Sequence, residues 1–170
     1  MSIDESTREA PSRGQVWRMF DRIAPRYDLL NRLLSFGRDR AWRRALTKYL
    51  PEGKNLFALD LATGTGDVLI ALHRDSGRLR GGIGADMSGG MLLQGRIKLQ
   101  HLALWDRYPL ARCDATQLGL REGVFDVVTI AFGIRNVVAV EAALEEMYRV
   151  LRPGGRLLIL EFSLPGNRLF

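Results

Sequence analysis

The sequence predicts an α/β fold, in which a doubly wound, mostly parallel sheet is preceded by a lobe of helices. Two observations favour this class. From residue 56 onward, apolar runs of strand length alternate with segments whose apolar residues recur at helical spacing. Strands that are joined by crossover helices lie parallel in one sheet. The chain has 170 residues, 46% of them apolar, which is enough to bury the core of a single domain.

Residues 15–52 are expected to form the helical lobe, with the polar residues 1–14 as a mobile arm in front of it. Two amphipathic helices are expected in the lobe, one before Pro25 and one before Pro51. Their apolar positions are Val16, Met19, Phe20 and Ile23 in the first helix, and Trp42, Ala45, Leu46 and Tyr49 in the second.

Residues 53–170 are expected to form the sheet. Strand-like runs occupy residues 56–62, 81–86, 109–115, 125–132 and 152–162. Helices are expected over about 67–74, from Ser88 onward and over 140–151, whereas a loop joins the third and fourth strands. The chain ends at Phe170, just beyond the fifth strand, which leaves an apolar sheet edge without a neighbour. We therefore expect either a truncated sequence with its final strands missing, or a partner chain or homo-oligomer that covers this edge.

The segment DLATGTGD, residues 60–67, is a candidate ligand site because it lies between a buried strand and a helix. Gly64 and Gly66 allow a tight turn whose backbone can approach a ligand closely. A dinucleotide-binding turn would carry a third glycine where Leu69 stands, and the sequence has no GxxxxGK(S/T) loop for a polyphosphate. A glycine turn with carboxylates at both ends suits a cationic adenosine ligand without phosphates, such as S-adenosylmethionine.

Polar positions follow four of the predicted strands, and they should meet at one edge because ligands of parallel sheets bind outside the carboxyl ends of the strands. They are Asp60, Asp86, Asp114 and the segment 133–136. Asp86 lies 20 residues after Gly66, a separation at which an acidic residue accepts hydrogen bonds from ribose hydroxyls. Asp114 suits the adenine amino group, with Ala115 as a backbone contact. A single aspartate at the end of a strand more often caps a helix or a turn. Three aspartates at the ends of successive strands favour a cofactor site.

Several segments resemble the ubiquinone and menaquinone biosynthesis C-methyltransferases. They are DLATGTGD, GADMSGGML, TIAFGIRN and EEMYRVLRPGGRLLILEFSLP, together with the opening stretch at residues 19–44. The resemblance covers about residues 16–165 and implies a sheet of the class I S-adenosylmethionine-dependent methyltransferase type, with seven strands in that family. The chain departs from the family in the loop at residues 118–126, where relatives usually carry Leu-Pro-Phe. Relatives also continue past the fifth strand into another helix and a final strand pair.

The resemblance also implies a cofactor, S-adenosylmethionine, and the positions that bind it. These positions are Asp60, Gly64, Thr65, Gly66, Asp86, Met87, Asp114, Ala115 and Ala131. Some relatives carry a serine where this chain has Ala131, so a hydroxyl contact is absent here. The implied acceptor is the ring of a polyprenylated hydroquinone, either a demethylmenaquinol or a ubiquinol precursor, and the sequence does not distinguish the two.

Methyl transfer from a sulfonium to an aromatic carbon requires that a ring hydroxyl lose its proton, so a base or relay and a positive group are expected near it. Arg135 is the candidate for stabilising the phenolate, since arginine is always charged and is a poor base. Asn136 is the candidate for orienting the ring. Tyr27 and Asp28 form a candidate proton relay or pocket cap, and core packing of Tyr27 with Asp28 as a turn cap explains them equally well.

The net charge of +6 is concentrated in the first 50 residues, which hold 11 Lys or Arg against 6 Asp or Glu. Nucleic acid, an anionic membrane or an acidic substrate each accounts for this, and so does a solvated helix without a partner. Because the implied acceptor is a lipid, we expect weak contact with an anionic membrane surface and no nucleic-acid partner. Trp17 and Trp42 are candidates for that interface and equally for the core.

The sequence has one cysteine, no apolar leader and no run that approaches 18 apolar residues. We therefore expect a cytoplasmic protein that is at most peripheral to the inner face of the membrane. The cysteine, Cys113, lies in an apolar run and is expected to be buried and inert. His73 and His101 lack metal-binding spacing, so no metal is expected.

Three functions are compatible with the sequence. The leading one is an enzyme that methylates a ring carbon of a lipid hydroquinone. The second is a methyltransferase that acts on another small acceptor, because many such enzymes share the cofactor half. The third is a catalytically weak binding or scaffold protein of the same fold. Titration with S-adenosylmethionine followed by a methyl-transfer assay separates them, since binding without turnover would favour the third.

Overall fold

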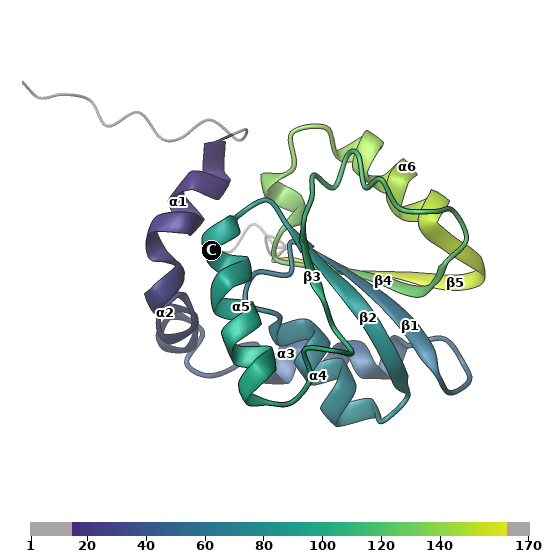
Figure 1. Ribbon diagram of the computed structural model, residues 1–170, viewed down its shortest axis with the longest axis horizontal. Helices are drawn as coiled ribbons and strands as arrows, with labels where there is room; N and C mark the ends of the chain where they lie inside the picture. Colours follow the sequence, from purple (N-terminus) through teal and green to yellow (C-terminus); the bar gives the residue numbers. More distant parts are fainter. Residues whose placement is uncertain (1–14, 163–170) are drawn as a thin grey trace, which may run out of the picture.

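The computed structural model describes residues 15–162, and a sheet of five parallel strands forms its centre (Figure 1). The strands are β1 (Leu56–Leu61), β2 (Leu79–Asp86), β3 (Leu110–Arg112), β4 (Phe125–Ala131) and β5 (Leu151–Leu160). They lie in the order β3-β2-β1-β4-β5, and every neighbouring pair is parallel. The chain therefore winds outward from β1 in both directions, and the strand order reverses between β1 and β4. The predicted α/β class with a doubly wound, parallel sheet is confirmed.

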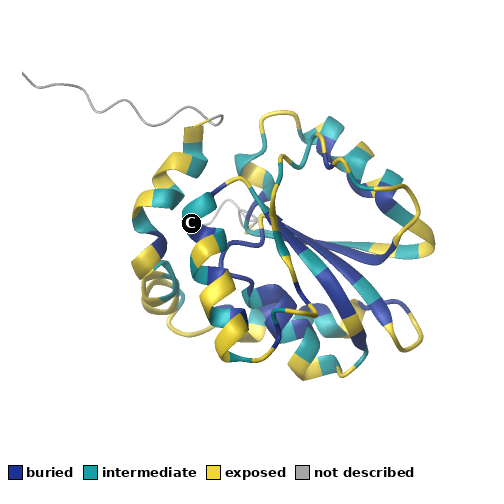
Figure 2. Ribbon diagram, in the orientation of Figure 1, coloured by how far each residue is buried: buried dark blue, intermediate teal, exposed yellow. Residues whose placement is uncertain are grey.

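Successive side chains of β1 enter two different cores, because side chains alternate between the two faces of a strand. Leu56 and Ala58 are buried on the face covered by α4 (Asp67–Ser76) and α5 (Gly89–His101). Leu59 and Leu61 are buried on the opposite face, which α6 (Val140–Val150) covers. Figure 2 shows the central strands in dark blue between these two layers. Because both faces of the central strands are covered, a ligand can approach these strands at their ends.

The helices that follow β1 and β2 begin where the sequence predicts. Gly66 stands before α4 with a φ of 82°, and Gly77 ends the helix with a φ of 60°, both in the left-handed region that glycine adopts without strain. Ser88 caps α5, because its side-chain oxygen accepts a hydrogen bond from the backbone N–H of Met91 at 3.2 Å. Both helix N-termini are thereby placed at the carboxyl edge of the sheet.

The lobe contains three helices rather than the two predicted: α1 (Val16–Ile23), α2 (Tyr27–Leu34) and α3 (Asp39–Ala45). α1 ends before Pro25 and α3 lies before Pro51, as predicted, whereas α2 was not predicted. Pro25 stands in the first turn of a short 3-10 helix, Ala24–Arg26, where its missing N–H leaves no hydrogen bond unmade, and α2 begins directly after it. A second 3-10 helix, Leu46–Tyr49, continues α3 and supplies the buried Leu46. Figure 1 shows α1 running beside α5.

The strand bounds differ from the predicted ones most clearly at β2, β3 and β5. β2 begins at Leu79, two residues earlier than predicted. β3 has only three residues, so Cys113, Asp114 and Ala115 lie in the loop that follows it rather than in the strand. β5 begins at Leu151, directly after α6, because this residue pairs with Phe125 before the register shifts. The predicted arm at residues 1–14 and the chain beyond residue 162 lie outside the described residues.

Gly82 provides a test of how tightly the sheet is packed. A Cβ atom at this buried position would lie 2.5 Å from the carbonyl oxygen of Ala58, whereas a Cβ at Gly89 would meet nothing within 4 Å. We expect Gly82→Ala to lower the free energy of unfolding by about 1–3 kcal/mol, the usual cost of overpacking. Gly89→Ala, in the first turn of α5, should leave it unchanged or raise it by roughly 0.5–1 kcal/mol. Urea unfolding of both variants measures the difference, and equal stabilities would contradict it.

Candidate functional site

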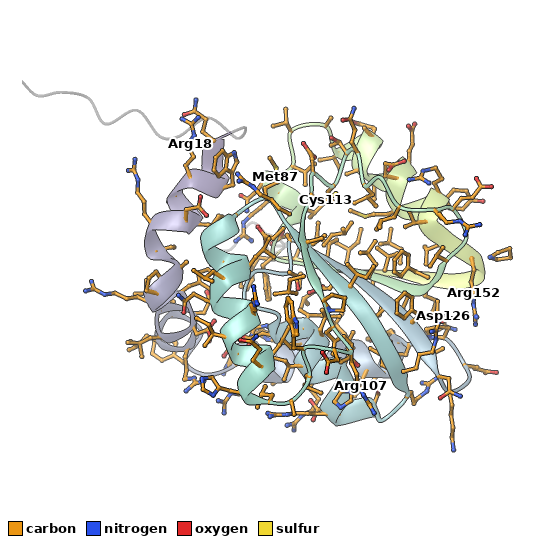
Figure 3. All side chains as sticks on the ribbon, in the orientation of Figure 1. Arg18, Met87, Arg107, Cys113, Asp126 and Arg152 are labelled. Atoms are coloured by element: carbon orange, nitrogen blue, oxygen red, sulfur yellow. The ribbon has the colours of Figure 1, made fainter. Side chains whose placement is uncertain are left out.

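A hollow of about 280 Å³ lies at the carboxyl edge of the sheet. The segments that follow β1, β2, β3 and β4 form its floor and sides, and α1 with the first residue of α2 forms the remaining wall. Its lining is mostly apolar, with the side chains of Asp86, Asp114 and Asn136 among the polar exceptions. Figure 3 labels Met87 and Cys113 at this edge, and it shows Asp126 and Arg152 far from it. The strand ends thus meet as predicted.

Asp60 lies beneath this hollow and does not line it. The residue is 1% exposed, and its two carboxylate oxygens accept hydrogen bonds from the hydroxyls of Thr63 at 2.6 Å and Thr129 at 2.5 Å. Burial raises the pKa of Asp60 to about 7, against the opposing effect of these two hydroxyls. Asp60 therefore joins the turn after β1 to the neighbouring strand β4, a role that differs from the predicted contact with a cofactor.

Asp86 lines the hollow and also holds the glycine turn in place. Its carboxylate oxygens accept hydrogen bonds from the backbone N–H groups of Gly64 and Ser88, each at 2.8 Å. Burial raises the pKa of Asp86, although these backbone groups oppose the effect. Gly64 faces the same space with a φ of 57°. The neighbouring Met87 is partly exposed and lines the hollow beside Asp86.

The loop after β3 contributes Asp114, Ala115 and Thr116 to the hollow. The Oδ1 atom of Asp114 accepts hydrogen bonds from the backbone N–H of Thr116 at 2.9 Å and from its hydroxyl at 2.8 Å. Cys113 lines the same space and is partly exposed, so the expectation of a fully buried cysteine was wrong. Because β3 ends at Arg112, this thiol lies in the loop at the mouth of the sheet. Burial raises the pKa of Cys113, which keeps it a thiol.

The segment after β4 closes the opposite side. Ala131, Gly133 and Asn136 line the hollow together with Phe132, whose φ of 58° turns the chain sharply at the end of the strand. A Cβ atom on Gly133 would lie 2.4 Å from the Cβ of Ala62, so this position requires glycine where the turns after β1 and β4 meet. The rings of Trp42 and Phe132 pack edge to face with their centroids 5.9 Å apart.

The lobe supplies an aromatic wall, of which the sequence analysis placed only Tyr27 at the pocket. Trp17, Phe20 and Tyr27 line the hollow, and the rings of Phe20 and Tyr27 pack edge to face at 5.8 Å. The Arg112 guanidinium lies 5.0 Å from the centre of the Trp17 ring. The helical spacing of Trp17 and Phe20 indicates an apolar face but not what that face covers.

Asp21 fastens this wall to the sheet domain. Its Oδ1 atom accepts hydrogen bonds from the Ser88 hydroxyl at 2.6 Å and from the backbone N–H of Gly90 at 2.8 Å, at the first turn of α5. The Ser88 hydroxyl and the Gly90 amide hold the pKa of Asp21 below its usual range, and the positive charge of Arg112 adds to this. The partners are separated by more than sixty residues, so no local pattern in the sequence indicates this contact.

Besides Asp60, four predicted site residues lie outside the lining of the hollow. Thr65 and Asp28 belong to a separate ionic cluster behind the glycine turn, where the Thr65 hydroxyl donates to Asp28 at 2.7 Å. Lys98 forms ion pairs with Asp28 and, at 2.7 Å, with Asp67. Gly66 serves as the residue before α4. The guanidinium of the fourth, Arg135, pairs with Glu161 and lies 5.8 Å from the centre of the Phe162 ring.

The site offers nothing to a metal in the part of the chain that the structure describes. No group of three or more His, Cys, Asp or Glu side chains there is arranged to hold an ion. The chemistry open to the hollow is therefore that of two carboxylates, an amide, a phenol and apolar walls. This set suits an uncharged or cationic organic ligand of moderate size.

Comparisons with known proteins agree with this geometry. The model of the ubiE/COQ5 methyltransferase family matches residues 7–170. The ubiquinone/menaquinone biosynthesis C-methyltransferase UbiE of Geobacter sulfurreducens is 48% identical over 152 residues, which is 89% of this chain and 59% of that protein. The demethylmenaquinone methyltransferase of Thermus thermophilus is 49% identical over 154 residues, which is 89% of this chain and 68% of that protein. The chain spans about three fifths to two thirds of the length of such relatives.

Solved structures show the same fold. The [4+2]-cyclase SpnF superimposes with a TM-score of 0.75 at 22% identity, over 94% of this chain and 66% of that one. At this identity the likeness concerns the fold alone. It indicates that the five strands described here are arranged as in a larger protein of the same class.

The raised pKa of Asp60 makes the stability of the protein depend on pH. Between the ordinary value of 3.8 and the folded value of about 7, the folded protein binds more protons than the unfolded chain, so stability falls as the pH rises through this window. We expect Asp60→Asn to flatten this dependence by on the order of 1 kcal/mol per pH unit. Urea unfolding between the two pH values measures the slope. The exposed Asp106→Asn variant should keep the wild-type slope, and an unchanged slope in Asp60→Asn would contradict the assignment.

Proposed function

The chain belongs to the ubiE/COQ5 methyltransferase family, and from this premise we propose that it transfers a methyl group from S-adenosylmethionine to a ring carbon of a polyprenylated hydroquinone in quinone biosynthesis. The observation that carries the proposal is the hollow at the carboxyl edge of the sheet. Its floor carries carboxylates suited to the nucleoside part of the cofactor, and its lobe wall is aromatic and suited to a quinol ring. One space thus serves both reactants.

The residues at the sheet edge fit the cofactor. Each oxygen of Asp86 accepts one backbone N–H and keeps a further lone pair, which suits it to accept hydrogen bonds from the ribose hydroxyls. A Cβ on Gly64 would lie 3.0 Å from the terminal methyl group of Met91, so the glycine leaves the backbone of the turn open to a ligand. Asp114 and Ala115, which line the hollow, are assigned to the adenine amino group and ring. When bound, S-adenosylmethionine supplies a methyl group that is activated by its sulfonium charge.

The acceptor half of the site is formed by the lobe and by the segment after β4. Tyr27 presents its phenol to the hollow and is assigned the proton relay from the ring hydroxyl, while the Asn136 amide orients the ring. Asp28, held by Lys98 and Thr65, is assigned the role of positioning the start of α2 next to Tyr27. The lobe and the sheet must therefore stay together for transfer to occur.

Arg135 is assigned the stabilisation of the phenolate that forms on the acceptor. Its guanidinium is half exposed and paired with Glu161. The Glu161 carboxylate is mostly buried, so the guanidinium is expected to keep its contact with Glu161 while it acts on the acceptor. The guanidinium carries five donors, which allows it to keep one contact with Glu161 while it donates to the ring oxygen.

The acceptor is a lipid, and we assign the protein to the cytoplasmic face of a membrane as a peripheral enzyme. Between residues 15 and 162, no helix is both long and apolar enough to cross a bilayer. The choice between a naphthoquinol and a benzoquinol is made by assay. Transfer of a labelled methyl group to a demethylmenaquinol, or to a ubiquinol precursor, tests the proposal directly. Tight S-adenosylmethionine binding without transfer to either quinol would contradict it and favour a scaffold.

Asp86→Ala should weaken S-adenosylmethionine binding, because the variant loses a charged acceptor for the ribose hydroxyls and loosens the glycine turn. A lost hydrogen bond to a charged group costs roughly 1.5–3 kcal/mol, which corresponds to about tenfold or more in Kd. Calorimetric titration measures the change. Asp106→Ala, which removes an exposed carboxylate before β3, serves as the control and should bind S-adenosylmethionine as tightly as the wild type does. Unchanged affinity in Asp86→Ala would remove the ribose assignment.

Arg135→Ala should lower the rate of methyl transfer far more than it lowers cofactor affinity. The guanidinium acts on charge that develops on the acceptor only during the reaction, so kcat should fall by about 10²-fold. The Kd for S-adenosylmethionine should stay within roughly twofold. Arg121→Ala, which removes an exposed arginine from the loop before β4, should change neither quantity. If Arg135→Ala keeps a kcat within about threefold of the wild type, Arg135 has a structural role only.

A further inference from the structure

Helix α2 exposes its entire apolar face. Four leucines fall on one contiguous side of this helix, because they are spaced three and four residues apart. They are Leu29, Leu30, Leu33 and Leu34, with exposed fractions of 61%, 40%, 64% and 80%. No residue of α2 is buried, and Figure 2 draws this helix mostly in yellow. An amphipathic helix normally turns such a face toward the core, so this one is available to a partner.

The turn after α2 adds an aromatic ring to the same surface. Phe36 is 93% exposed and adopts a φ of 51°, a left-handed conformation that is uncommon for an aromatic residue. The backbone N–H of Gly37 donates to the carbonyl of Arg32 at 2.9 Å, which closes the helix end and holds this turn. The ring of Phe36 is therefore displayed outward by an ordered turn.

Positive charge lies beside this apolar surface. Arg22 and Arg26 precede α2 in the chain, Arg38 follows it, and all three are exposed. Arg32 and Arg40 belong instead to the ionic cluster that contains Asp28 and Asp39. The acidic residues between positions 15 and 50 are engaged elsewhere: Asp21 with Ser88 and Gly90, Asp28 with Lys98, and Asp39 with Arg43. This part of the lobe thus presents leucines and a phenylalanine to solvent next to exposed arginines.

We propose that this surface docks on an anionic lipid bilayer. We name it the α2 apex, and it consists of Leu29, Leu30, Leu33, Leu34 and Phe36 with Arg26 and Arg38. The leucines and the phenylalanine enter the boundary between headgroups and acyl chains, and the guanidinium groups bind lipid phosphates. Charge complementarity selects this occupant, because a surface that combines outward apolar side chains with unopposed cations matches an anionic bilayer.

The α2 apex also lies next to the hollow. Tyr27, the first residue of α2, lines the hollow, while the leucines of the same helix face solvent. A bilayer seated on the apex would therefore lie one helix away from the acceptor site. The link between the apex and the acceptor site rests on the proposed function, because a quinol acceptor that is a lipid must be taken from a membrane.

The two tryptophans that were candidates for a membrane interface in the sequence analysis do not belong to this surface. Trp17 lines the hollow beside Arg112, and Trp42 packs between Phe132 and Phe162 at 5.9 and 5.4 Å. Both are only partly exposed. The residues that contact lipid are instead the leucines and the phenylalanine of the α2 apex.

Vesicle flotation tests the proposal with the full chain. The wild type should float with vesicles of phosphatidylglycerol and phosphatidylcholine, and far less with phosphatidylcholine alone. Leu34→Ser/Phe36→Ser should lower the partition coefficient by about tenfold or more, because two exposed apolar side chains no longer enter the bilayer. Arg26→Gln/Arg38→Gln should lower it by on the order of tenfold on anionic vesicles only, and raised salt should have the same effect. Tyr148→Ser, an 81% exposed aromatic on α6, is the matched control and should float as the wild type does.

A second readout locates the inserted ring. The tryptophan fluorescence that Phe36→Trp adds should be quenched by bromine-labelled lipid. The fluorescence that Tyr148→Trp adds should not be quenched. Equal flotation of the wild type and Leu34→Ser/Phe36→Ser would overturn the proposal. A second result would also overturn it: the wild type forms a dimer in the ultracentrifuge, the double variant is a monomer, and neither protein binds vesicles. A second copy of the chain would then cover the apex. A wild type that floats through the apex but does not bind S-adenosylmethionine would uphold this inference and overturn the proposed function.

Discussion

A buried carboxylate joins the two central strands at their carboxyl ends, and the candidate site is built on that contact. Asp60 bonds Thr63 in the turn after β1 and Thr129 on β4, at a pKa raised to about 7 by burial. Ala62 and Phe132 both take left-handed conformations just after the ends of β1 and β4, so each strand turns away where it ends. The close approach of these two turns leaves no room for a side chain at Gly133. The floor of the hollow is thereby held rigid before any ligand binds.

The hollow is complete only when the lobe is in place. Asp21 fixes α1 to the first turn of α5, and Lys98 of α5 holds Asp28 of α2. These contacts bring Trp17, Phe20 and Tyr27 over the strand ends. Because the cofactor positions lie on the sheet and the acceptor positions lie largely on the lobe, such contacts control how the two reactants would meet. The same helix that carries Tyr27 displays its leucines to solvent, which links the acceptor site to a surface suited to lipid.

The sequence predicted those features that depend on neighbouring residues. Parallel strands, the Ser88 cap and the positions of Asp86 and Asp114 at strand ends follow from apolar runs, turn residues and spacing. Features that depend on distant residues were missed or placed differently. Asp60 resembles a ligand contact in the sequence, yet a hydroxyl on β4, sixty-nine positions away, makes it a buried support. Arg135 follows a strand end as expected, but its pairing with Glu161 depends on how β5 is placed. The exposed face of α2 was overlooked because no helix was expected directly after Pro25, whereas the 3-10 turn leads the chain into a new helix at Tyr27.

The central claim is that S-adenosylmethionine binds in the hollow at the carboxyl ends of β1 to β4. Titration with its demethylated product, followed by the backbone amide signals in nuclear magnetic resonance, tests this most directly because it locates the ligand residue by residue. The account predicts the largest shifts at Gly64, Met87 and Ala115, and small shifts at Arg43 and Asp75 in the ionic cluster behind the glycine turn. Shifts centred on that cluster, or no shifts at a saturating concentration of the product, would contradict it.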